Sequence, residues 1–277
     1  RDDVESRGLG DVYKRQTLDQ YPLSDIPFRM KNTPESIFEI QHTYTAGGLI
    51  YTSNVASICM PYPRNSDNVY SNVVIEELGD AATTWSPLRP NGFFYGNLMP
   101  EGSADLRRDM LMVTEWNGVK FTSGDAIVTR PFMGPKFWCP NLQAAYDSNN
   151  YKVFRYADAV LMAAECYCAL LDKDKAMEYL NKVKRRAGIA EYTQFRTYPL
   201  LLNEIQNERG RELLGEFQRK FDMVRWGIWY ERTASLSDYA KVKTSIQPCH
   251  EYYPIPDTEV IYSGGALDNN EYKKYGF

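Results

Sequence analysis

The spacing of apolar residues changes character near residue 150. From residue 36 to about 140, apolar residues alternate with polar ones or form short runs broken by Gly, Pro and Asn. Every second side chain from Phe38 to Tyr44 is apolar or aromatic (His42 apart), which is typical of a half-buried strand. Long loops at Met60–Asn68 and Ala81–Pro100 suggest functional segments. Further strands are predicted at Asn72–Glu76, Asp109–Trp116 and Asp125–Pro131.

From Tyr151 onward the period becomes helical. Small and apolar residues form one stripe over Val153–Leu171, which predicts a helix of about five turns. A second stripe covers Ala176–Ala187, with Asp174 as its predicted N-cap and Gly188 as the residue that ends it. Two amphipathic helices joined by a short turn form an antiparallel hairpin, similar to one tetratricopeptide unit.

A third helical stretch, Leu200–Tyr230, carries charges where its apolar stripe should continue. Charges on a buried stripe must be paired, because desolvation otherwise costs on the order of several kcal/mol each. Partners recur three residues apart, where helix geometry brings side chains together. The predicted pairs are Glu208–Arg211, Arg209–Glu212, Glu216–Arg219 and Asp222–Arg225. We interpret these residues as a structural ion-pair lattice made of Glu208, Arg209, Glu212, Glu216, Arg219, Asp222 and Arg225.

The same carboxylates are poor candidates for catalysis. Two facing carboxylates can hydrolyse a glycosidic bond, but the general acid needs burial without a cation. Here each carboxylate has an arginine three residues away, which lowers its pKa. The sequence has no GxSxG, HExxH, Walker-A or GxGxxG arrangement. We therefore expect a protein that is not an enzyme, and a glycoside hydrolase is the less favoured alternative.

Composition excludes several further classes. The net charge of −4 argues against nucleic-acid binding, which needs clustered Lys and Arg. Five cysteines without a CxxC pair indicate neither a disulfide framework nor a zinc site. With two histidines besides, we expect no metal and no cofactor. No stretch is apolar enough to cross a bilayer.

Aromatic residues supply the candidate ligand contacts. The chain has 21 Tyr, 12 Phe and 5 Trp. A sugar ring has an apolar C–H face and a rim of hydroxyls, so it suits a flat aromatic ring flanked by polar side chains. Two loops, Met60–Tyr70 and Trp85–Tyr95, combine both kinds of residue. The predicted ligand-binding residues are Tyr62, Arg64, Asn68, Tyr70, Trp85, Phe93 and Tyr95.

The second half of the chain resembles the SusD/RagB family. That family has an R-x-A-D-x-x-L-x-x-A-E helix and a P-I-P-x-x-E motif near its end, and both patterns occur here in order with three further blocks. The five blocks are Arg155–Glu165, Ala176–Gly188, Ile205–Glu216, Arg219–Gly227 and Tyr253–Glu259. Weaker matches lie at Glu35–Ile40, Asp105–Arg108 and Lys136–Phe137. The ending Asn269–Tyr272 departs from the family, since it lacks the usual Gln and Gly.

This resemblance implies a mainly α fold, in which a tetratricopeptide-like hairpin scaffold carries an irregular, partly β, loop-rich lobe. It implies a lipoprotein on the outward face of the outer membrane that captures oligo- or polysaccharide for a SusC-like TonB-dependent transporter. The lipid anchor and most of the family's N-terminal helices have no counterpart in these residues. The family's binding residues lie outside its motifs, so none transfers to a position in this chain. A peptide-binding relative, or a helical-repeat interaction protein, remains the alternative.

These observations divide the chain into four expected segments. Residues 1–16 alternate in charge without periodicity and resemble a leader translated in error, so we expect them to be non-native. Residues 17–150 should form the mixed α/β ligand-binding lobe, and residues 151–232 the helical scaffold. Residues 233–277 should form an irregular segment that packs back on the scaffold.

Overall fold

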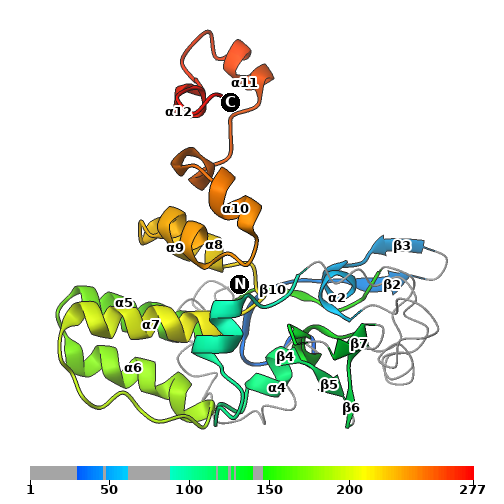
Figure 1. Cartoon of the computed structure of the whole chain (residues 1–277), viewed down its shortest axis with the longest axis vertical. Helices are drawn as coiled ribbons and strands as arrows, with labels where there is room; N and C mark the ends of the chain where they lie inside the picture. Colours follow the sequence, from blue (N-terminus) through cyan, green and yellow to red (C-terminus); the bar gives the residue numbers. More distant parts are fainter. Residues whose placement is uncertain are drawn as a thin grey trace, which may run out of the picture. The chain divides into compact units, whose positions relative to one another are not determined.

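The structure is a computed structural model that describes residues 30–45, 48–61, 88–116, 118–123, 126–127, 129–139 and 146–277. The chain divides into two compact units (Figure 1). Unit 1 runs to Glu216 except for a short excursion, and unit 2 consists of Asn91–Phe93 and Phe217–Phe277. Helices dominate and the strands are short, so the mainly α fold class predicted from the sequence is confirmed.

Three helices form the scaffold of unit 1: α5 (Tyr156–Ala169), α6 (Lys173–Arg186) and α7 (Tyr198–Glu212). They lie side by side in Figure 1 and share one apolar core. Burial of each leucine or isoleucine there contributes about 1.5–3 kcal/mol. The predicted antiparallel hairpin is α5 and α6, an arrangement compatible with a tetratricopeptide unit. The core residues of the three helices are Ala157, Val160, Leu161, Ala164, Cys168, Ala176, Leu180, Val183, Leu201 and Ile205.

The ends of α6 show which local signals the sequence carried. Asp172, rather than the predicted Asp174, is the N-cap, because its side chain accepts a hydrogen bond from the Lys175 N–H at 3.1 Å. Asp174 lies in the first turn instead. Gly188 ends the helix as predicted, with a φ of +70°, and the Ile189 N–H donates to the Lys184 carbonyl.

The first helix begins later than its apolar stripe suggests. Residues Tyr151–Arg155 form strand β10, which pairs antiparallel with β1 (Ser36–Ile40). Alternate side chains of a strand point to opposite faces, so Lys152 and Glu39 meet in the interior with Nζ and Oε1 2.6 Å apart. β1 confirms that the first half of the predicted Phe38–Tyr44 strand is extended, but the faces are reversed: Glu39 is buried, whereas Phe38 and Ile40 are exposed. The ion pair of Glu39 with Lys152 decides which face turns inward. After it, β2 (Thr43–Thr45) pairs with β3 (Gly48–Tyr51).

The predicted third helix is three helices. α7 ends at Glu212, α8 spans Arg219–Arg225 and α9 spans Trp229–Leu236. The breaks contain Gly215, Phe217 and Gly227, all with positive φ. A left-handed residue cannot continue a right-handed helix, so the chain turns at each break.

The rest of unit 1 is built from short elements around Trp138, Phe121 and Phe132. The predicted strand Asp109–Trp116 is instead a helical turn that ends at Leu111, followed by the two-residue strands β4 (Met112–Val113) and β5 (Glu115–Trp116). Of the predicted strand Asp125–Pro131, β8 is the part that forms, and Asn72–Glu76 lies outside the described residues. The remaining elements are α2 (Val55–Cys59), η3 (Phe94–Leu98), α4 (Arg108–Leu111), β4 (Met112–Val113), β5 (Glu115–Trp116), β6 (Val119–Lys120), β7 (Thr122–Ser123), β8 (Ala126–Ile127), β9 (Phe132–Met133) and η4 (Pro135–Phe137).

Unit 2 is a series of short helices with little interior. Of its hydrophobic residues, Trp229 and Cys249 are the buried ones. Its later segments are tied down by specific contacts: Lys220 Nζ lies 3.9 Å from the ring centre of Tyr253, and the Asn269 side chain bonds both backbone groups of Ile255. After α8 and α9 come α10 (Ala240–Ser245), η5 (Pro248–Glu251), α11 (Asp257–Tyr262) and α12 (Asn270–Lys273). Across the described residues, no helix has the length and apolarity needed to span a membrane.

Candidate functional site

Two of the seven predicted ligand-binding residues lie in the described part of the chain. Phe93 and Tyr95 are both half-buried. Tyr62, Arg64, Asn68, Tyr70 and Trp85 lie outside the described residues.

Tyr95 lies in η3, a π-helix, and its ring packs against the apolar cluster of Phe94, Met99, Leu111 and Met112. Part of the ring therefore serves the core and part faces outward. Phe93 precedes η3 and belongs to unit 2. Its neighbour Gly92 is held there by the Asp238 carboxylate.

Part of the predicted ion-pair lattice forms: Glu208, Glu212 and Glu216 lie in one buried network, whose centre is Glu212. This side chain is 4% exposed and is held by three guanidinium groups. Arg107 Nη1 lies 2.7 Å from Glu212 Oε2, Arg155 Nη1 lies 2.6 Å from Oε1, and Arg186 bonds Oε1 as well. These arginines come from separate segments, so one carboxylate joins the end of α7, the start of α5, the end of α6 and the segment before α4.

Glu216 forms a second node in the same network. It accepts hydrogen bonds from Lys136 Nζ at 2.7 Å and from Arg155 Nη2 at 2.7 Å. Lys136 is 2% exposed, and its ammonium also donates to the carbonyls of Glu212 and Leu214 at the end of α7 and just past it. A cation at this position satisfies carbonyls that the ended helix leaves without partners.

Two further carboxylates extend the network. Glu208 bonds Arg107 at 2.7 Å and Arg211 at 2.7 Å. Glu35 bonds Arg155 at 2.8 Å and Arg186 at 2.9 Å. Each of the four carboxylates of this network therefore has at least two cations, whose attraction offsets the desolvation that burial imposes.

The electrostatics of the network make Glu208, Glu212 and Glu216 unsuited to act as general acids. Burial raises the pKa of Glu212, but Arg186, Arg155 and Arg107 outweigh it and hold that pKa well below its ordinary range. Glu208 and Glu216 have lowered pKa values for the same reason. A carboxyl that stays ionised cannot donate a proton to a leaving group.

Two of the four predicted pairs form as expected. Glu208 pairs with Arg211, and Asp222 with Arg225 at 2.8 Å. Arg209, predicted to pair with Glu212, pairs instead with Asp158 of α5 at 2.8 Å.

Glu216 pairs with Lys136 and Arg155 instead of with Arg219. The physical reason is the end of α7 at Glu212: beyond it, residues three apart no longer share a helix face. Arg219 lies in unit 2 and is half-buried, as part of α8.

Residue spacing did not predict the ion pairs between residues that are far apart in the sequence. Periodicity identifies partners on the same helix, whereas Arg107, Arg155 and Arg186 come from other elements. A signal was present, because every one of these charges lies in a block that resembles the SusD/RagB family. The residues missed are Glu35, Asp105, Arg107, Lys136, Arg155, Asp158 and Arg186.

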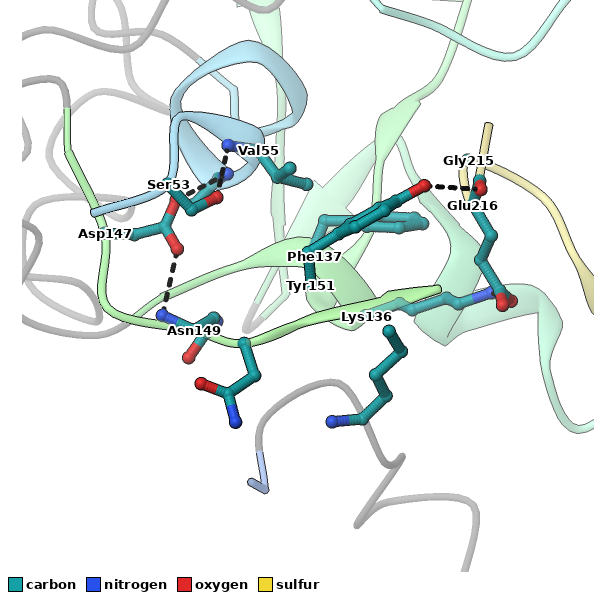
Figure 2. A pocket seen from close by; sticks show the side chains of 12 residues that line it. Ser53, Val55, Lys136, Phe137, Asp147, Asn149, Tyr151, Gly215 and Glu216 are labelled. Atoms are coloured by element: carbon teal, nitrogen blue, oxygen red, sulfur yellow. Dashed lines mark hydrogen bonds and ion pairs between the residues drawn. The ribbon is translucent and has the colours of Figure 1, made fainter. Parts of the chain in front are cut away.

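A small cavity of about 30 Å³ adjoins this network (Figure 2). One water molecule needs a cavity volume of about 10–15 Å³, whereas pockets for ligands have volumes of roughly 300 Å³ or more. The cavity therefore suits about two water molecules and is too small for a sugar ring. In Figure 2 the Tyr151 hydroxyl points to the backbone of Glu216, to whose carbonyl it donates at 3.1 Å. The lining residues are Ser53, Val55, Ala56, Lys136, Phe137, Asp147, Asn149, Asn150, Tyr151, Lys152, Gly215 and Glu216.

Asp147, at the other end of the cavity, holds two segments of the backbone together. Its carboxylate accepts hydrogen bonds from the N–H groups of Ala56 and Asn149, both at 3.0 Å, and so ties α2 to the segment before β10. Burial raises its pKa. Nearby, burial also raises the pKa of the Cys59 thiol to about 12, so the reactive thiolate is scarce at neutral pH. In the described residues no group of side chains has the composition of a metal site.

Comparison with known proteins connects this scaffold to one family. The SusD family model matches residues 141–272. A SusD-like protein, P25, from Formosa agariphila is 37% identical over 135 residues, which are 46% of this chain and 25% of that protein.

Solved structures extend the likeness of the fold. Surface glycan-binding protein A from Bacteroides thetaiotaomicron superposes with a TM-score of 0.63 and 20% identity, over 96% of this chain and 59% of its own. The same protein in complex with laminarihexaose gives a TM-score of 0.60 at 21% identity, over 96% of this chain and 60% of its own. A SusD homolog from Bacteroides thetaiotaomicron gives 0.64 at 22% identity, over 95% of this chain and 52% of its own.

The chain thus spans a quarter of the curated relative's length and somewhat over half that of these structures. The matched segment begins before β10 and contains the whole α5–α7 scaffold with Arg155, Arg186 and Glu212. Over residues 141–272, the chain is therefore similar to the SusD family.

Proposed function

We propose that this chain is part of a surface protein that binds glycan without cleaving it. The observation that carries the proposal is the SusD family match across the helical scaffold and its ion network. The fold, shared over 96% of this chain with a protein solved in complex with laminarihexaose, supports a sugar ligand. The buried carboxylates support the non-catalytic part, because their arginine partners keep them ionised.

We further propose a location for this binding and a destination for the ligand. The protein would sit on the outward face of the outer membrane, held by a lipid anchor. It would pass oligo- or polysaccharide to a SusC-like TonB-dependent transporter. The predicted contact residues, Trp85 among them, would determine which glycan binds.

Affinity gel electrophoresis of the 277-residue chain tests the proposal. A panel of polysaccharide gels and laminarihexaose in solution serve as probes, and at least one should retard the protein or compete for it. We expect a Kd between about 1 μM and 1 mM, or roughly −8 to −4 kcal/mol. No reducing sugar should be released from the polymer that binds. Retardation by none of the glycans, together with binding to a peptide library, would favour the peptide-binding alternative.

The variant Trp85→Ala tests the loop assignment. Loss of one aromatic platform should weaken glycan binding, because stacking on the C–H face of a sugar needs a flat ring. A ring that contacts ligand and does not pack in the core should leave the melting temperature within about 1–2 °C of the parent. Equal affinity of the variant and the parent in titration calorimetry removes Trp85 from the contact residues, and so does a large fall in melting temperature.

A further inference from the structure

The segment Asn91–Phe93 is fastened to the rest of unit 2 by side-chain hydrogen bonds. The Gly92 N–H donates to both carboxylate oxygens of Asp238, at 2.9 and 3.0 Å. The Asn91 Nδ2 group donates to the Leu236 carbonyl at 3.3 Å. The partners are 146 and 145 positions apart in the sequence, so these bonds fix a contact that local structure does not supply.

This attachment brings together two aromatic residues. Phe93 follows Gly92 directly, and Tyr239 follows Asp238 directly. The hydrogen bond between Gly92 and Asp238 therefore places the backbones that carry the two rings side by side. Tyr239 is 57% exposed, and its N–H is held by the Ser237 hydroxyl at 3.2 Å. Exposed aromatic rings with a fixed backbone give large contact area at small entropic cost.

The chain immediately after Phe93 has an uncommon backbone. Residues Phe94–Leu98 form a π-helix, in which the Met99 N–H bonds the Phe94 carbonyl at 2.9 Å. Such turns are rare and occur frequently at functional sites. This observation is independent of the contacts made by Asp238, and it concerns the same stretch of chain.

We propose that Asp238 is a positioning residue that sets Phe93 beside Tyr239, and that the two rings form a sugar-contacting subsite on unit 2. The proposal rests on the proposed glycan-binding function and adds a location to it. Neither Asp238 nor Tyr239 stands out in the sequence, because their relation to Phe93 exists only in the folded chain. Phe93 was already a predicted contact on composition alone.

A double-mutant cycle on the full chain tests the proposal, with laminarihexaose and the polysaccharide panel as probes. Phe93→Ala, Tyr239→Ala and Asp238→Ala should each weaken binding of the retarding glycan about three- to tenfold. Because Asp238 acts through Phe93, the double variant Asp238→Ala/Phe93→Ala should lose no more than Phe93→Ala alone. Asp238→Asn keeps one acceptor oxygen and should restore most of the affinity.

Hydrogen exchange at the Gly92 amide supplies a readout that needs no ligand. Exchange should accelerate in Asp238→Ala and stay near the parent rate in Asp238→Asn. Tyr262→Ala removes another exposed aromatic ring of unit 2, 82% exposed, and as matched control should leave affinity unchanged.

Three outcomes overturn the proposal: an unchanged Gly92 exchange rate in Asp238→Ala, additive losses in the double variant, or an equal loss in Tyr262→Ala. If the parent binds no glycan while Gly92 exchange still responds to Asp238→Ala, the proposed function fails and the sugar subsite with it. The positioning bond is then retained as a property of the fold. The two failures are therefore distinguishable.

Discussion

Among the single residues, the buried charges of the ion network should be especially costly to replace. Glu212 forms ion pairs with three arginines, each of which lies in a different segment of the chain. Removing one member of such a group leaves the others buried without a counter-charge, which costs more than the pair contributed. Pairs with two exposed members, such as Arg185 with Glu191, lose far less when broken.

The variant Glu212→Gln should therefore lower the free energy of unfolding by about 3–5 kcal/mol. Urea unfolding followed by circular dichroism measures this loss. Arg185→Ala, whose side chain is 49% exposed and whose partner Glu191 is 38% exposed, should cost at most about 1 kcal/mol and serves as the control. Equal losses in the two variants would show that burial of the network has no energetic role.

The pH dependence of stability depends on the same carboxylates. Glu208, Glu212 and Glu216 have pKa values below the ordinary 4.5 in the folded chain. A carboxyl with a lowered folded pKa stabilises the fold above its unfolded pKa, and this contribution is lost as the pH falls towards the folded value. Asp147, with its raised pKa, acts in the opposite direction, but it is one group against three.

We therefore expect the free energy of unfolding to fall steadily as the pH drops below 4.5. Urea titrations at intervals between about pH 7 and pH 3 measure this slope. In Glu212→Gln the slope should be shallower, because one of the titrating groups is gone. A parent whose stability does not change below pH 4.5 contradicts the assignment.

Among the elements, left-handed residues decide where helices end. Gly188 ends α6, and Gly215 lies in the turn that follows α7. The same turn brings the chain against the core, since a Cβ atom at Gly215 would lie 2.4 Å from the Phe137 ring and 2.7 Å from Met133 Cε. Gly227 has a similar φ of +67° but open space around it.

This pair of glycines gives a matched test of packing against strain. Gly227→Ala should cost about 1–2 kcal/mol from the left-handed backbone alone. Gly215→Ala should cost roughly 1–3 kcal/mol more, because the methyl group overpacks the core at Phe137. Chemical unfolding of both variants measures the difference. Equal costs would mean that Phe137 and Met133 move aside freely.

For the molecule as a whole, the two units differ in how much core they have. The α5–α7 scaffold of unit 1 buries a continuous apolar cluster, whereas the buried hydrophobic residues of unit 2 are Trp229 and Cys249. Regions with few buried contacts open at lower free energy than regions with a dense core. Unit 2 instead relies on contacts such as that of Lys220 with Tyr253.

Hydrogen exchange followed by mass spectrometry should therefore separate the units. We expect amides in α5 and α6 to exchange at least about 100-fold more slowly than amides in α11 and α12, which corresponds to about 2.7 kcal/mol of opening free energy. Uniform protection along the chain would show that unit 2 gains stability from contacts beyond its own.

The mainly α class was implied by the resemblance to the SusD/RagB family, whereas the pattern of residues was enough to predict the α5–α6 hairpin, its end at Gly188 and the ion pair of Glu208 with Arg211. These features depend on residues three or four positions apart, so their spacing carries the information. The resemblance to the SusD/RagB family was equally readable, because it lies in ordered blocks of residues. The change of period near residue 150 needed no structure either.

Which charges meet, and where the elements stop, depends on the folded chain. Arg209 pairs with Asp158 rather than Glu212, and residues 151–155 form a strand rather than the start of a helix. Each of these outcomes depends on a partner from a distant segment, such as β1 for β10, and spacing along one element cannot show it. The placement of Phe93 by Asp238 is of the same kind: it exists only because folding brings residues 146 positions apart into contact.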